Sequence, residues 1–234
     1  MSETVIREVL TRILVRPFSR FGLVPIGGRS TAIKLKAGGV WVLASTPLDT
    51  ETKTQIDALG PVKYIIGADA VHHLFLGDFK KAYPDAKLIA PEPAIERHGD
   101  KDLKFDGAWG RDPADTKYGF EDEHSYFSAF KNKDVAFLHK DSQSLIEADL
   151  LFNLPPNEQY SKSKPAARLP FQLTPFSWLH AKFTWSMAED VETMKRDAHK
   201  VAGWNFDRII PCHGDVIETG GVAAWKAAYK KYFE

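Results

Sequence analysis

The sequence has a single cysteine, Cys212, and contains no long apolar run. One cysteine rules out a disulfide within the chain and favours a reducing compartment. No uninterrupted apolar stretch approaches the roughly 18 residues that a membrane-spanning helix needs. Residues 1–22 also lack the apolar centre and the small-residue cleavage site of a secretory signal peptide. We therefore expect a cytoplasmic protein that does not span a membrane.

The sequence also lacks an excess of either charge, since 31 basic residues (Lys and Arg) are matched by 31 acidic ones (Asp and Glu). Nucleic acids and anionic membrane surfaces attract proteins with a basic excess, so neither is expected as the main partner. Apolar residues make up 44% of the chain, an ordinary proportion for a globular protein. The length suits one well-filled domain over residues 1–234, and a small-molecule substrate is the expected partner.

Apolar periodicity and turn-forming residues predict an alternation of strands and helices. Apolar residues spaced as on one face of a helix predict an amphipathic helix over 5–14, and Gly38-Gly39 between apolar runs predicts a hairpin over 31–43. A polar stretch rich in Gly, Pro and Asp predicts a surface loop over 97–124. The other expected elements are helices at 50–59, 74–83, 189–201 and 222–233, and strands at 62–66, 87–90, 134–138, 144–152 and 206–211.

Four residues suited to metal binding lie on or after strands that are far apart in the sequence. His72 and His73 follow the strand at 62–66, Asp149 lies in the strand at 144–152, and His213 follows the last strand. Imidazole and carboxylate groups are ligands that zinc, iron and manganese accept. A histidine pair or a His-Gly turn alone is commonly structural. A carboxylate in an apolar strand is more telling, because its burial is costly without a partner. Together the residues predict a metal site.

The segments VKYIIGADAVHHLF, KAYPDAKLIAP, SQSLIEADLLFNLP and FDRIIPCHGDVI resemble the metallo-β-lactamase superfamily, and within it a divergent branch of uncharacterised DUF4336-type proteins. The resemblance runs from about residue 29 to residue 215. It implies an α+β fold, the metallo-β-lactamase-like αββα four-layer sandwich. It also implies metal ligands from an H-x-H-x-D-H loop, a later histidine, a bridging aspartate and a final histidine.

The resemblance places the chain's residues on that pattern with one departure. His73 takes the last histidine of the loop motif and His72 takes its aspartate, whereas the first two histidine positions fall on Ala68 and Ala70. Asp149 matches the bridging aspartate, and His213 matches the final histidine. Because two histidines are replaced by alanines, the resemblance implies one bound ion rather than two. Zinc is the expected metal, with iron as an alternative.

The histidine that precedes the hairpin in this pattern has two candidates. His124 matches it best by order and spacing, and His139, at the end of the strand at 134–138, is the alternative. The expected metal ligands are therefore His72, His73, His124, Asp149 and His213.

The resemblance implies a metal-dependent hydrolase in which a metal-activated water attacks an ester, lactone, thioester or phosphoester. Asp69 and Asp215 are the candidates for a general base or for a residue that orients a ligand, although either could simply cap a turn. Two alternative functions remain at this point. One is a catalytically weak or inactive metal- or ligand-binding protein of the same fold, and the other is an iron-dependent oxidoreductase.

Overall fold

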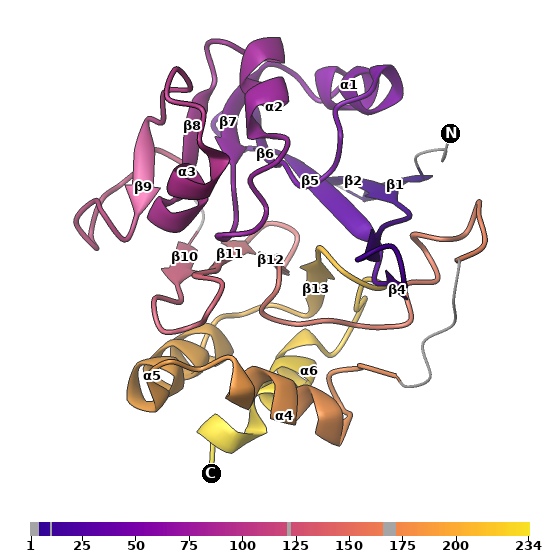
Figure 1. Ribbon diagram of the computed structural model, residues 1–234, viewed down its shortest axis with the longest axis vertical. Helices are drawn as coiled ribbons and strands as arrows, with labels where there is room; N and C mark the ends of the chain where they lie inside the picture. Colours follow the sequence, from indigo (N-terminus) through magenta and orange to yellow (C-terminus); the bar gives the residue numbers. More distant parts are fainter. Residues whose placement is uncertain (1–4, 10, 121–122, 166–171) are drawn as a thin grey trace.

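The computed structural model describes residues 5–9, 11–120, 123–165 and 172–234, and these form two β-sheets between two layers of helices (Figure 1). The larger sheet has the strand order β1-β2-β5-β6-β7-β8-β9, and the smaller has the order β10-β11-β12-β13. The strands of the larger sheet are β1 (Val5–Val9), β2 (Thr11–Arg16), β5 (Gly28–Lys34), β6 (Val40–Leu43), β7 (Val62–Ile66), β8 (Lys87–Pro91) and β9 (Gly107–Trp109). Those of the smaller are β10 (Glu123–Tyr126), β11 (Val135–His139), β12 (Ser144–Glu147) and β13 (Arg208–Pro211).

The helices divide into two groups, one for each sheet (Figure 1). The larger sheet is covered by α1 (Thr50–Asp57), α2 (Leu76–Ala82) and α3 (Glu92–His98). The smaller is covered by α4 (Trp178–Ser186), α5 (Val191–Ala202), α6 (Gly221–Ala228) and a 3₁₀ turn (Lys230–Tyr232). A short ribbon of β3 (Ser19–Arg20) and β4 (Val24–Pro25) follows β2. The expected αββα sandwich is confirmed.

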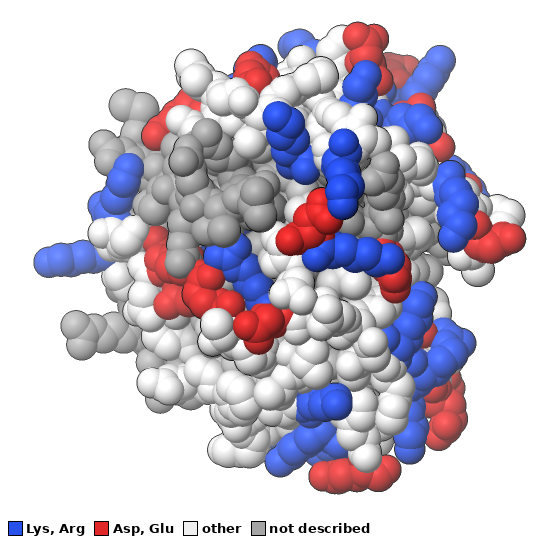
Figure 2. Space-filling model, turned by 180° about the vertical axis from the view of Figure 1, so that it is seen from behind, with Lys and Arg blue, Asp and Glu red and all other residues white. Residues whose placement is uncertain are grey.

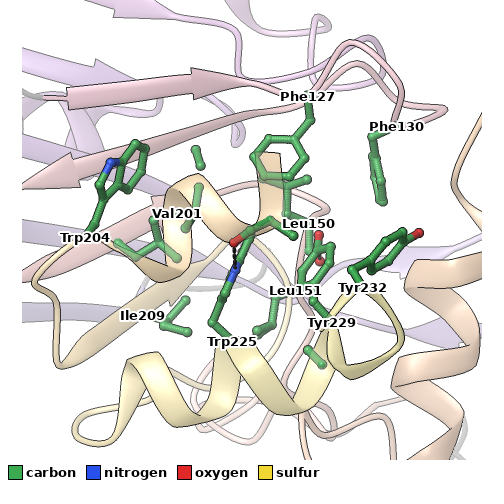
Figure 3. Packing of buried hydrophobic residues seen from close by; sticks show 14 of the residues in the cluster. Phe127, Phe130, Leu150, Leu151, Val201, Trp204, Ile209, Trp225, Tyr229 and Tyr232 are labelled. Atoms are coloured by element: carbon green, nitrogen blue, oxygen red, sulfur yellow. Dashed lines mark hydrogen bonds between the residues drawn. The ribbon is translucent and has the colours of Figure 1, made fainter. Parts of the chain in front are cut away.

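Three apolar clusters correspond to the three interfaces between these layers. Residues such as Ile33 and Trp41 of the larger sheet pack against Phe137 and Ile210 of the smaller sheet between the two sheets. A second cluster fills the space under α1, α2 and α3. The third joins the smaller sheet to its helices, where the Trp225 indole donates a hydrogen bond to the carbonyl of Ala198 at 3.1 Å (Figure 3). Both faces of each sheet are therefore covered, as burial of the apolar strands requires.

The helix expected over residues 5–14 is wrong, because this segment forms the antiparallel pair β1–β2. Ile13 and Val15 face the smaller sheet, whereas Leu14 between them faces the helices. A strand that is buried on both faces carries apolar residues without strict alternation, so its periodicity resembles that of a helix.

Two further expectations need correction. The stretch 97–124 is not only surface loop, because it includes the edge strand β9 and the start of β10, and Trp109 and Tyr118 in it are buried. A three-residue strand is too short to produce a periodic pattern. The strand expected over 144–152 ends at Glu147, which leaves Asp149 beyond the strand.

The sequence has equal numbers of basic and acidic residues, and both kinds are present on the surface. On the face shown in Figure 2, basic and acidic side chains lie among one another. Within the described parts of the chain, no helix combines the length and the apolarity needed to cross a bilayer.

Candidate metal site

Two neighbouring parallel strands bring Asp149 and His213 to the same edge of the smaller sheet. The last residues of β12 and β13, Glu147 and Pro211, are register partners. Asp149 and His213 each follow two residues later, so both side chains leave the sheet at the same level. The carboxyl ends of parallel strands are where sites form in such sheets.

Strand β12 ends at Glu147. Beyond it, side-chain carboxyl groups accept hydrogen bonds from backbone N–H groups, in place of the backbone of a neighbouring strand. The backbone N–H of Asp149 donates to Asp134 at 2.6 Å, and that of Leu151 donates to Glu147 at 3.0 Å. Both carboxyl groups are fully buried, and burial raises the pKa of each well above its ordinary value. The two side chains thus fix the loop that presents Asp149.

His72 comes from the other sheet, on the loop that follows β7. One carboxylate oxygen of Asp69 accepts from the backbone N–H groups of Val71 and His72, both at 2.8 Å, and lies 2.9 Å from Nδ1 of His72. This oxygen holds the proton on Nδ1, so Nε2 of His72 presents its lone pair. The Asp69 carboxylate is completely buried and acts on the ring from behind.

His213 is oriented in the same way by a backbone carbonyl. Its Nδ1 lies 2.6 Å from the carbonyl oxygen of Gly27, to which it donates, so its Nε2 also presents a lone pair. The two Nε2 atoms of His72 and His213 are 3.2 Å apart, and Nε2 of His213 is 3.2 Å from Oδ1 of Asp149. That Oδ1 is buried and accepts no hydrogen bond. Three electron-pair donors therefore face one point.

This arrangement fits a metal ion. Ligand atoms about 2.0–2.1 Å from a tetrahedral zinc ion lie roughly 3.3 Å from one another, close to both spacings observed here. Among the residues that the structure describes, His72, Asp149 and His213 are the group of histidine, cysteine and acidic side chains whose ligand atoms all lie within 4.8 Å of one another. The buried, unpartnered Asp149 oxygen has the property expected of a metal ligand.

The site also attracts positive charge. Burial alone would lower the pKa of His72, but the carboxylates of Asp69 and Asp149 outweigh it and raise that pKa to about 9, so that without a cation Nε2 carries a proton at neutral pH, which a metal ion would displace. Burial would raise the pKa of Asp149, but His72 and His213 outweigh it and lower that pKa. The ionised Asp149 therefore favours a cation between the two imidazoles.

Two groups that sequence reasoning missed support the ligands. Nδ2 of Asn132 donates to Oδ2 of Asp149 at 2.6 Å, which leaves only Oδ1 facing the histidines. The Gly27 carbonyl orients His213, although Gly27 carries no side chain. No spacing or motif marks Asn132, which lies in the turn before β11, and a backbone carbonyl leaves no signal in a sequence.

His73 lies apart from the three converging side chains. Its ring packs edge-on against His98, and its backbone carbonyl accepts a hydrogen bond from that residue at 2.9 Å. Burial and then His98 lower the pKa of His73. The structure therefore brings together His72, Asp149 and His213 of the expected ligands but not His73.

His124 and His139 lie toward the opposite end of the smaller sheet. His139 ends β11, which runs antiparallel to β12, so it pairs with Ser144 at the start of that strand. His124 pairs with Phe137 one strand further out, and its ring lies 5.7 Å from that of Trp109. Neither histidine belongs to the converging group among the described residues.

Neither of the two candidate catalytic aspartates belongs to the converging group among the described residues. Asp69 contacts the back of His72, as described above. Asp215 accepts hydrogen bonds at 2.8 Å from the backbone of Glu158 and from the side chain of Asn157. Its carboxylate thus secures the loop after residue 153, which packs next to His213. Ala68 and Ala70, which occupy the first two histidine positions of the pattern, are buried.

A cavity of about 320 Å³ opens directly onto the three converging side chains. Its lining includes all three of them, together with residues from the segments 16–28, 45–47 and 71–75. The volume suits a small organic molecule.

Comparison with solved structures identifies the architecture. No family model matches the sequence, and no curated protein matches it. The metallo-β-lactamase from Pontibacter korlensis superposes with a TM-score of 0.61 at 10% identity, over 100% of both chains. The diflavin flavoprotein A 5 fragment from Nostoc sp. PCC 7120 gives 0.66 at 13% identity, over 99% of this chain and 96% of that one. The Flv1 flavodiiron core from Synechocystis sp. PCC6803 gives 0.64 at 15% identity, over 99% and 61%. From its layers and these likenesses, the chain has the metallo-β-lactamase fold.

Proposed function

We propose that this protein is a metal-dependent hydrolase that holds one zinc ion between His72, Asp149 and His213. The observation that carries the proposal is the convergence of three electron-pair donors at a buried point beside a cavity. A divalent ion bound there would supply a water of lowered pKa and would polarise a carbonyl or phosphoryl oxygen of the substrate. Three protein ligands leave room for that chemistry at an open position.

The chain's own residues divide the remaining work. Asp69 is a positioning residue, because its contact with Nδ1 keeps the lone pair of His72 directed at the site. Asp215 holds the loop that packs beside His213. Neither carboxylate lines the cavity, which favours positioning over proton transfer for both.

An iron-dependent oxidoreductase is the second candidate, and one observation favours it. Flavodiiron and diflavin proteins are among the chains of the same fold. A site with two ions would need more ligands than the three that converge here, so a single ion is proposed for either chemistry.

Metal content and turnover test the proposal together. The protein is expressed with zinc and iron in the medium, and bound metal is measured by plasma mass spectrometry. We expect about one zinc ion per chain, and loss of most of it in His213→Ala and Asp149→Ala, with circular dichroism to check folding. The same variants should lose hydrolysis of any ester, lactone, thioester or phosphodiester that the wild type accepts.

Matched histidine variants serve as controls. His199→Ala, on the exposed side of α5, and His124→Gln, in the aromatic cluster, are expected to keep the metal. Absence of metal from the wild type, or full retention in both ligand variants, would contradict the proposal. Full occupancy without turnover would favour a binding protein, and coloured, oxygen-consuming iron protein would favour the oxidoreductase.

A further inference from the structure

The cavity beside the proposed metal site has mostly apolar walls. Phe18 and Ile26 come from the segment that follows β2, and Val71, Leu74 and Phe75 come from the loop that carries His72. Phe18 and Leu74 are themselves exposed, at 49% and 69%, so apolar surface continues from the cavity to its rim. Two of the proposed metal ligands are buried, since the side chains of Asp149 and His213 are only 4% and 6% exposed.

Charge along the cavity is one-sided. Apart from the three proposed ligands, the charged residues that line it are Arg16 and Arg20. Arg16 is paired with Asp49, the N-cap of α1. Arg20 is exposed, has its guanidinium 5.4 Å from the ring centroid of Phe21, and forms no ion pair with any residue that the structure describes. The guanidinium of Arg20, at the rim of the cavity, therefore has no carboxylate partner among the described residues.

We propose that the cavity binds an amphiphilic ester with one anionic group. The ester carbonyl lies at His72, Asp149 and His213, the hydrocarbon body packs on Phe18 and Leu74, and the anionic group lies at Arg20. This inference rests on the proposed hydrolase function and names its substrate class. An apolar wall with a few placed polar groups is the usual way in which such a pocket selects its ligand, and a guanidinium matches the geometry of a carboxylate.

The reaction that follows from this pose is simple hydrolysis. The oxygen of one water bonds to the carbonyl carbon, the bond from that carbon to the alcohol oxygen breaks, and the departing oxygen gains a proton. The products are a carboxylic acid and an alcohol, with no change of oxidation state and no second reactant. The anionic group remote from the carbonyl is unchanged and serves only in binding.

Substrate pairs that differ only in charge test the selectivity. The probes are mono-4-nitrophenyl esters of a series of linear dicarboxylic acids and the 4-nitrophenyl esters of monocarboxylic acids with the same acyl lengths. We expect the metal-loaded wild type to favour the anionic member by about tenfold in kcat/KM at one or more lengths, as a hydrogen bond to a charged group allows. Arg20→Gln should remove that preference, and Arg20→Lys should restore part of it.

A charge-matched control and a binding measurement complete the test. Arg111→Gln removes an exposed arginine that does not line the cavity, and it should keep the preference. Calorimetry with the unreactive monoanilides of the same dicarboxylic acids, and with their neutral counterparts, reports binding without turnover. Tighter binding of the anion that depends on Arg20, without hydrolysis of any ester, would support Arg20 as the site of the anionic group and overturn the hydrolase.

Three other outcomes would contradict the proposed substrate class. Hydrolysis of neutral esters as fast as anionic ones would overturn it and leave the hydrolase standing. An anion preference that persists in Arg20→Gln would also overturn it. If neither the esters nor the anilides show any preference for the anion, the proposed class is wrong regardless of metal content.

Discussion

At the scale of single residues, the ligands depend on neighbours that fix their orientation. Asn132 holds Oδ2 of Asp149 at 2.6 Å, and Asp69 and the Gly27 carbonyl fix the two imidazoles. Each ligand therefore has one polar atom occupied by the protein and one directed at the site. Such outer partners commonly change metal affinity without contacting the metal.

Asn132→Ala is expected to weaken metal binding. Without its amide, Oδ2 of Asp149 loses a donor and the carboxylate can rotate away from the histidines. We expect the zinc dissociation constant to rise by about 10- to 100-fold, the range typical for loss of an outer partner. Competition with a chromophoric chelator measures it. Asn205→Ala, at an exposed asparagine, is the control, and equal dissociation constants for both variants would contradict this role.

The sequence could identify some of these residues and not others. Asp149 could be predicted, because an acid in an apolar segment is costly to bury without a partner. His213, in a His-Gly turn, was marked only in combination with the other candidates. His73 could not be separated from His72, since the two adjacent side chains are distinguished only by the contacts of Asp69 and His98. The ambiguity between His124 and His139 has a similar cause, because both lie on strands whose direction in the sheet was unknown.

At the scale of elements, the loop after β13 allows very little space. Gly214 has φ +92°, and a Cβ there would lie 2.2 Å from the carbonyl oxygen of Asn153. Gly38, with φ +86°, has nothing within 4 Å of the corresponding position. Alanine at Gly38 therefore tests the cost of the left-handed backbone alone, whereas alanine at Gly214 adds the cost of steric overlap with Asn153.

We expect Gly38→Ala to lower the free energy of unfolding by only about 1–2 kcal/mol, the cost of the backbone conformation. Gly214→Ala should cost roughly 3 kcal/mol or more, because the loop must also shift away from Asn153. The shift should move His213 and reduce metal binding as well. Urea unfolding and metal titration measure both effects. A Gly214→Ala protein that matches Gly38→Ala in stability and binds zinc normally would argue against this account.

Helix α4 is joined to the loop after Asp149 through a buried histidine. Nε2 of His180 accepts from the backbone N–H of Phe152 at 2.9 Å, and burial lowers the pKa of His180 to about 4. The unfolded chain, with a histidine pKa near 6.5, binds a proton between these values when the folded chain does not. Stability from this residue is therefore present above about pH 6.5 and is lost as the pH falls towards 4.

Between pH 7.5 and pH 5 this difference should lower the free energy of unfolding by about 2 kcal/mol. His180→Gln keeps an acceptor for the Phe152 N–H but cannot be protonated. Its free energy of unfolding should therefore fall by about 2 kcal/mol less than that of the wild type over the same pH range. The difference between the two proteins in urea unfolding isolates this residue from other titrating groups. His199→Gln, on the exposed face of α5, should behave like the wild type. Identical pH dependence in wild type and His180→Gln would refute the assignment.

How well a helix or strand could be predicted from the sequence depends on its length and on whether one or both of its faces are buried. The long helix α5 and the strands β7 and β13 were predictable because caps and apolar runs mark them. The β1–β2 pair has the apolar spacing of a helix because both faces of the sheet are buried around Leu14. The edge strand β9 is only three residues long, and it is recognised only by its pairing with β8.

At the scale of the whole molecule, metal binding should be visible in thermal stability. A ligand at 100 times its dissociation constant adds about 2.7 kcal/mol to the folded state if the unfolded chain does not bind it. For a chain of this size that corresponds to a rise in Tm of roughly 5–10 °C. We expect a chelator to remove this rise in the wild type and to have no effect on His213→Ala. A wild-type Tm unchanged by zinc and chelator would contradict a specific site.

The three proposed ligands do not come from one layer of the sandwich. His72 belongs to the half built on the larger sheet, and Asp149 and His213 belong to the half built on the smaller one. An ion held by all three would tie the halves together, so that one half could no longer open without the other. Amide hydrogen exchange should then slow on both sides of the molecule when zinc binds, including in strands far from the site. The metal would thus govern how cooperatively this protein unfolds as well as what it binds.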